Sequence, residues 1–155
     1  MESTKKPKIA IAYGVTGGRH PQMLGAAVAI NKAFEKNFEV VAHFGFSGGA
    51  IVAAIMAADI HRIAGGPEGW IERSTPYGKY GKIGGFFNIW CNIGNLFWRG
   101  GLLNSARLHD KVFRHILKDL RLKKPAYCGS WCVSHSKEVI MPIQYNPGIS
   151  IACSA

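Results

Sequence analysis

The chain has 155 residues, 48% of them hydrophobic, which predicts a single domain with a core and excludes a disordered chain. Nineteen Lys and Arg against nine Asp and Glu give a formal charge of +10, which favours anionic partners. No stretch reaches the ~18 uninterrupted apolar residues of a spanning helix, and the N-terminal apolar run is too short for a signal peptide. We therefore expect a cytoplasmic protein that can also lie peripherally on a membrane. Its four cysteines are expected to be thiols: Cys91, Cys128, Cys132 and Cys153.

The N-terminal third alternates strand and helix patterns. In chain order the patterns predict a strand at 8–13, a glycine-rich loop, a helix at 21–36, a strand at 38–44, a turn at 45–49 and a helix at 50–63. Two strands with a helix between them form a βαβ unit, so a parallel sheet is expected.

The rest of the chain is less regular. Residues 64–103 are rich in glycine and aromatic residues, and 105–120 has the pattern of an amphipathic helix with Ser105 as its N-cap. Residues 125–134 and 138–145 are predicted as two strands joined by a polar turn.

A serine lies at the predicted strand-to-helix junction. The segment "GFSGG" fits G-x-S-x-G, with Gly45 and Gly49 on either side of Ser47. The glycines allow close backbone approach, and the hydroxyl would project at the N-terminus of the following helix, where the dipole favours developing negative charge. The alternative is a Gly-Ser turn that merely begins a helix.

A hydrolase also needs a site for the oxyanion. The loop "YGVTGGRHP" would emerge at the same sheet edge as the Ser47 turn, because parallel strands end at one edge. Backbone N–H groups of Gly17, Gly18 and Arg19 are candidate donors, together with that of Gly48. Neither a P-loop nor G-x-G-x-x-G fits this loop.

The order of these features resembles the patatin-like phospholipases. The resemblance rests on the glycine-rich loop with Arg19 and Gly25, on G-x-S-x-G, on "RGGLLNSARLHDKVFRHIL", and on the C-terminal stretch that ends in "CSA". It implies a three-layer α/β fold with a mainly parallel sheet, present here as a single domain over 1–155 that is incomplete at its C-terminal side. It also implies a lipid acyl hydrolase with a Ser–Asp dyad, in which Ser47 forms an acyl-enzyme on a phospholipid or another acyl lipid.

Two departures from the family pattern matter. Val15, Thr16 and His20 replace glycines of the family loop, and no Asp-Gly, the family's motif for the catalytic base, occurs in this sequence. The aspartates are Asp59, Asp110 and Asp119, all within predicted helices. We expect a second polypeptide, or a missing segment, to supply the base and complete the sheet. The alternative is an inactive lipid-binding or assembly subunit with the same fold.

Other catalytic constellations are less consistent with the sequence. A Ser47–Asp–His135 triad of the α/β-hydrolase type, with Asp110 or Asp119, would need more strands before its nucleophile. Cys128 and Cys132 do not have the usual spacing of zinc ligands and are predicted to be core thiols. No metal and no cofactor are expected.

The segment 84–101, "GGFFNIWCNIGNLFWRGG", combines aromatic residues with a polar stripe. As a helix it would be a membrane-facing or lid surface with Phe86, Phe87, Trp90 and Phe97, or it would simply be buried against the sheet. The basic runs "KKPK" and "RLKK" match no nucleic-acid-binding motif, and no nucleic-acid partner is expected.

Overall fold

The computed structural model describes residues 5–16, 20–58, 69, 121–145, 150 and 154. The elements in chain order are β1 (Lys8–Tyr13), α1 (His20–Phe34), β2 (Glu39–Phe46), α2 (Gly48–Ala57), β3 (Ala126–Cys132), the 3-10 turn η4 (Val133–His135) and β4 (Lys137–Pro142).

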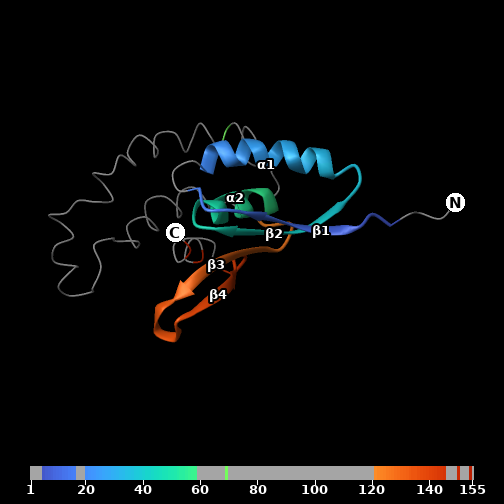
Figure 1. Cartoon of the computed structure of the whole chain (residues 1–155). Coiled ribbons are helices and arrows are strands. Elements are labelled where there is room, and N and C mark those ends of the chain that lie inside the picture. The colour runs from blue at the N-terminus through green and yellow to red at the C-terminus, as the bar shows by residue number, and fades with distance from the viewer. Residues whose placement is uncertain are drawn as a thin grey trace.

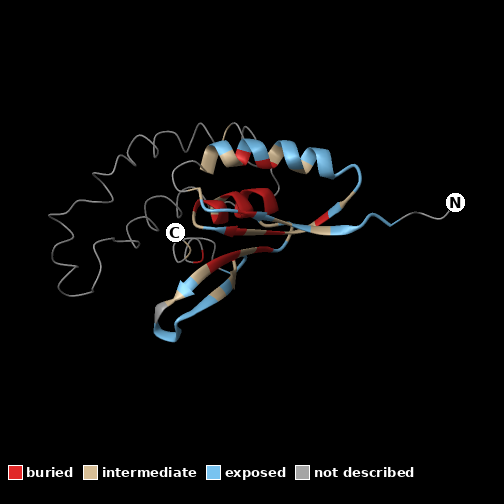
Figure 2. Ribbon diagram, viewed as in Figure 1, coloured by how far each residue is buried: buried red, intermediate tan, exposed pale blue. Residues whose placement is uncertain are grey.

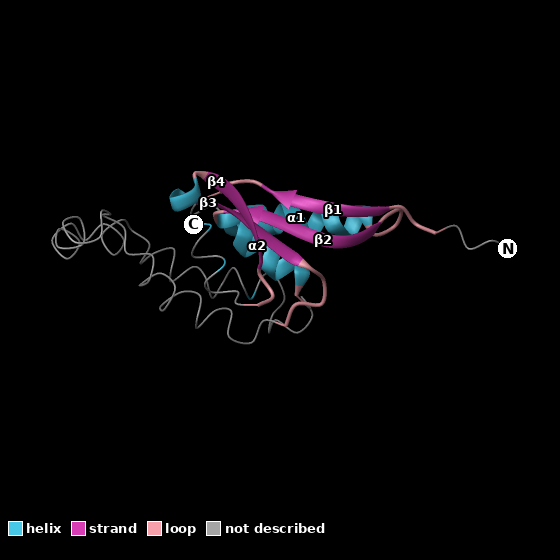
Figure 3. Ribbon diagram, turned by 90° about the horizontal axis from the view of Figure 1, so that it is seen from below, coloured by secondary structure: helices cyan, strands magenta, loops and turns pink. Residues whose placement is uncertain are grey.

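The four strands form one mostly parallel sheet in the order β1-β2-β3-β4. Strands β1, β2 and β3 run parallel, and β4 returns antiparallel to β3 as a hairpin. Helices α1 and α2 lie on the same side of the sheet (Figure 1), and the sheet lies in front of both when it is seen from below (Figure 3). This arrangement confirms an α/β fold with a mainly parallel sheet. The third layer of a patatin-like fold stays a prediction.

Most predicted elements are present. The first strand has the predicted bounds, and the second runs two residues further than predicted, to Phe46. Helix α1 begins at His20 and ends at Phe34, two residues before the predicted end. The predicted C-terminal strand pair is confirmed with shorter strands, and Ser136 (φ 46°) forms the turn between η4 and β4. The predicted helix at 105–120 lies outside the described residues.

Helix α2 was predicted to extend to residue 63, and this prediction is wrong. The helix ends at Ala57, and Ala58 is extended (φ −74°, ψ 167°). The cause is a long-range contact: Ala58 forms a β-bridge with Leu122. The amides of Lys123 and Lys124 donate to the Ala57 carbonyl at 2.8 and 3.1 Å, so the returning chain satisfies a carbonyl of the last turn.

The core lies between the sheet and α2. Nine of the ten residues of α2 are buried, all except Ile51. The small residues of "GGAIVAAIMA" let the helix axis approach the strands closely, which maximises contact between the helix and the sheet. Figure 2 shows this concentration of burial in α2, whereas much of α1 and the outer part of the β3–β4 hairpin are exposed.

A β-bulge in β2 sets which residues face α2. The pairing shifts after Ile9 so that Val41 has no partner in β1. The extra residue puts Val40 on the same face as His43 and Gly45, and all three are buried.

The opposite face of the sheet carries exposed apolar side chains. Phe46, Trp131 and Ile140 are 39%, 58% and 63% exposed. The strand register and the alternation of side chains put all three on the face away from the helices. None of the described helices has the length and apolar character needed to cross a membrane.

Candidate functional site

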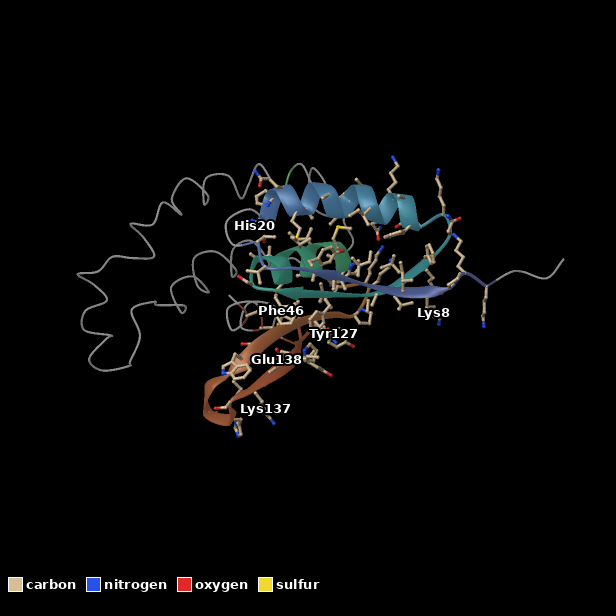
Figure 4. All side chains as sticks on the ribbon, viewed as in Figure 1. Lys8, His20, Phe46, Tyr127, Lys137 and Glu138 are labelled. Carbon is tan, nitrogen blue, oxygen red and sulfur yellow. The ribbon has the colours of Figure 1, made fainter. Side chains whose placement is uncertain are left out.

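The serine turn lies at the carboxyl edge of the parallel strands. Tyr13 at the end of β1 pairs with Gly45 near the end of β2, so the loop after β1 begins beside the Ser47 turn. Figure 4 shows His20 at the start of α1 and Phe46, which precedes Ser47, toward the same end of the sheet, with Lys8 at the other end. The predicted common edge is confirmed by this register.

Ser47 has a backbone conformation that is rare for a residue with a side chain. Its φ is 50° and its ψ is −126°, outside the helical and extended regions. Such a conformation costs about 1–3 kcal/mol and persists only where the surroundings enforce it. The turn joins β2 directly to α2, which confirms the strand–turn–helix context predicted around G-x-S-x-G.

The two glycines of the motif are required by close backbone contacts. A Cβ on Gly45 would lie 2.6 Å from the Ala50 nitrogen and even closer to the Gly49 carbonyl. A Cβ on Gly49 would lie 2.5 Å from the Tyr13 carbonyl oxygen and would also meet the Gly14 carbonyl. Helix α2 therefore begins in direct contact with the ends of both β2 and β1, and this contact holds the Ser47 turn in place.

The Ser47 hydroxyl does not cap the helix. Ser47 occupies the N-cap position of α2, but its side chain makes no capping hydrogen bond. A serine that merely begins a helix accepts a hydrogen bond from an amide of the first turn. The positive φ of Ser47 aims the hydroxyl elsewhere, and the residue is partly exposed. This geometry favours a serine that presents its hydroxyl at the surface over a simple helix start.

Ser154 supports the turn from the far end of the chain. Its hydroxyl accepts a hydrogen bond from the Ser47 amide at 2.9 Å and donates to the Gly129 carbonyl at 2.5 Å. One side chain thus connects the backbone of the serine turn to β3. The sequence does not predict this role of Ser154, because a contact across 107 residues leaves no local signal.

The candidate oxyanion donors are described only in part. Gly48 is buried and is the first residue of α2, so its amide has no acceptor within the helix. Gly17, Gly18 and Arg19 lie outside the described residues. In the same loop, the buried Thr16 hydroxyl has no hydrogen-bond partner in the described part of the chain. Thr16 therefore has a hydroxyl at a position where the patatin-like loop has a glycine.

A Tyr–His pair lies beneath this edge of the sheet. The Tyr13 hydroxyl and His43 Nδ1 are 2.9 Å apart, and the two rings stack with centroids 5.9 Å apart. Burial, with a smaller contribution from the charge of Lys124, lowers the pKa of His43 to about 4. Burial also raises the pKa of Tyr13 above its ordinary value. His43 is therefore neutral at pH 7, and no hydrogen bond among the described residues joins it to Ser47.

His135 contacts a cysteine rather than Ser47. His135 Nδ1 lies 3.2 Å from Cys132 Sγ and 3.0 Å from the Ser134 hydroxyl. Within the described chain, no hydrogen bond connects His135 to Ser47, and Asp110 and Asp119 lie outside that part. The described residues therefore assemble no Ser–His pair of the α/β-hydrolase kind.

The prediction that both strand cysteines are core thiols is half right. Cys128 is fully buried, and its thiol donates to the Ser150 carbonyl at 3.2 Å. Cys132 is only partly buried, because the hairpin extends past the helices that cover Cys128. Among residues with known placement, no group of three or more potential metal ligands occurs. Phe86, Phe87, Trp90 and Phe97 lie outside the described residues.

No family model matches the chain, and no curated protein matches it.

Proposed function

We propose that this chain supplies the nucleophile of a patatin-like lipid acyl hydrolase and that Ser47 is that nucleophile. The observation that carries the proposal is the Ser47 turn: a non-glycine residue at φ 50° between a strand and a buried helix, with a hydroxyl that does not cap the helix. Strain of this kind is typical of nucleophile elbows. The order of motifs in the sequence supports the family.

The proposed reaction is acyl transfer through Ser47. The Ser47 oxygen attacks the ester carbonyl carbon, and its proton passes to an aspartate carboxylate from a second polypeptide or a missing segment. The Gly48 amide, with the loop amides of Gly17, Gly18 and Arg19, stabilises the oxyanion. The alcohol then leaves with a proton, and water releases the acid from the acyl-enzyme. A phospholipid surface is a suitable source of substrate because the chain carries a charge of +10.

A non-catalytic role in lipid binding or assembly is the second candidate. It is favoured by one observation: no carboxylate in the described part of the chain contacts the Ser47 hydroxyl. Such a subunit would keep the turn without using its hydroxyl.

Hydrolysis by the natively purified protein separates the two candidates. The protein, with any polypeptide that copurifies with it, is incubated with anionic phospholipid vesicles and the released fatty acid is quantified. The hydrolase proposal predicts release that Ser47→Ala abolishes. Ser134→Ala, in the turn after β3 where the Ser134 hydroxyl contacts Cys132 and His135, leaves release unchanged. Equal release by the wild type and Ser47→Ala, or no release by a folded complex, would favour the non-catalytic role.

A further inference from the structure

The end of the β3–β4 hairpin brings together a thiol, an imidazole and a hydroxyl. Cys132 is the last residue of β3, and Ser134 and His135 belong to the 3-10 turn that follows. The Cys132 sulfur lies 3.2 Å from His135 Nδ1 and 3.3 Å from the Ser134 hydroxyl. Among the described residues, no hydrogen bond joins this cluster to Ser47.

The contacts suit a thiolate. An imidazole at this distance can accept the thiol proton and then donate it back as a hydrogen bond to the charged sulfur. The Ser134 hydroxyl can donate a second hydrogen bond to the same sulfur. These hydrogen bonds, from Ser134 first and His135 second, hold the pKa of the Cys132 thiol below its ordinary value.

The charge around the sulfur is positive. Lys137 pairs directly with Cys132 across the hairpin, so the two side chains share one face. Glu138 pairs with Trp131, and its side chain therefore lies on the other face. Figure 4 shows Lys137 near the outer end of the hairpin, away from the helices. Among the described elements packed here, the ionisable groups on the Cys132 side are His135 and Lys137.

We propose that Cys132, with His135 as its base, is a nucleophilic thiol site that forms mixed disulfides with small anionic disulfides. The Cys132 proton moves to His135, and the thiolate sulfur attacks one sulfur of the disulfide. A new S–S bond forms to Cys132 while the original S–S bond breaks, and the released thiolate takes up a proton. The disulfide is the oxidant, and each exchange reduces it to one thiol. Lys137 attracts the anionic reagent.

Cys128 provides an internal control in the same strand. It lies four positions before Cys132 on the same face of the sheet, but its side chain is fully buried. A reagent whose reaction rate depends on both the exposure and the reactivity of a thiol will therefore distinguish Cys132 from Cys128 within one molecule.

The test is the pH dependence of disulfide exchange at each cysteine. The native protein is treated briefly with 5,5′-dithiobis(2-nitrobenzoate), a dianionic disulfide, between pH 5 and 9, and adducts are located by peptide mass spectrometry. The same chain unfolded in urea gives the reference rate for each thiol. At pH 7 we expect native Cys132 to react about threefold or more faster than unfolded Cys132, and Cys128 to be protected. The gain is modest because a more acidic thiol is also a weaker nucleophile.

Variants assign the cause of the effect. His135→Gln should lower the native rate at pH 7 to the unfolded value and restore the pH profile of an ordinary thiol. Lys137→Gln should slow the dianionic reagent more than the neutral 4,4′-dithiodipyridine. Far-ultraviolet circular dichroism checks that each variant is folded. Two results would overturn the proposal. The first is a native wild-type Cys132 that reacts with the rate and pH profile of the unfolded chain. The second is a folded His135→Gln variant that reacts like the wild type.

Discussion

Gly49 tests whether backbone contact enforces the strained serine turn. Gly49→Ala would place a methyl group against the Tyr13 and Gly14 carbonyls, where neither backbone can move freely. We expect it to lower the free energy of unfolding by about 2 kcal/mol, as overpacking does. Urea denaturation followed by circular dichroism measures the change.

The matched control is Gly25→Ala in helix α1. A Cβ on Gly25 would meet nothing within 4 Å, and the residue is exposed in the helix. Alanine there should raise the free energy of unfolding by about 0.5–1 kcal/mol, because glycine is the poorer helix former. Equal effects of the two substitutions would show that α2 does not pack against the end of β1 as described.

Ser154 is expected to hold the backbone of the turn. Ser154→Ala leaves the Ser47 amide and the Gly129 carbonyl without their shared partner, which costs about 1–3 kcal/mol for a partly buried pair. Because the turn loses support, we also expect slower modification of Ser47 by a fluorophosphonate. Ser150→Ala is the control, since within the described part of the chain the Ser150 hydroxyl donates a longer bond, of 3.4 Å, to the Pro142 carbonyl. If both variants behave alike, Ser154 has no special role at the turn.

At the scale of the elements, the Tyr13–His43 pair links β1 to β2 and makes their association depend on pH. The pKa of His43 is about 4 in the folded protein against an ordinary 6.5. Between these two pH values, His43 therefore binds a proton in the unfolded chain but not in the folded chain. The contribution of His43 to the free energy of unfolding has its full value above about pH 6.5 and falls by about 3 kcal/mol in total as the pH drops to about 4.

His43→Gln isolates this contribution. Its free energy of unfolding should fall less steeply than that of the wild type between pH 7 and pH 4.5, because the titrating imidazole is gone. Urea midpoints at the two pH values provide the comparison. Parallel curves for the two proteins would mean that His43 is not buried in its neutral form.

The sequence pattern predicted helices and strands correctly where neighbouring residues determine where the element begins and ends. The alternating "KIAIAY", closed by Gly14, gave β1 its bounds, and the small residues around Ser47 gave the strand–turn–helix. The end of α2 could not be found in this way, because a bridge to Leu122 sets it. Long-range structure also explains why the role of Ser154 was not predicted and why Cys132 is not a core thiol. Ser154 contacts a residue 107 positions away, and Cys132 is only partly buried because the hairpin extends past the helices.

At the scale of the whole molecule, the sheet has one face covered by the described helices and another with exposed apolar groups. Phe46, Trp131 and Ile140 lie on the latter. Among the described strands, β1 and β4 lie at the two edges of the sheet, and an edge strand carries backbone groups that can pair with a further strand. Both features are compatible with the proposed second polypeptide, which would add strands and bring the aspartate to Ser47. The charge of +10 favours an acidic partner or an anionic lipid surface.

The most direct test of the central claim is whether Ser47 is chemically activated. Natively purified protein, with whatever copurifies, is treated with a fluorophosphonate and analysed by intact-mass spectrometry, with Ser47→Ala and heat-denatured wild type as controls. We expect one probe adduct on this chain, and we expect both controls to lack it. A folded wild type that gains no adduct, or an adduct that persists in Ser47→Ala, would contradict it.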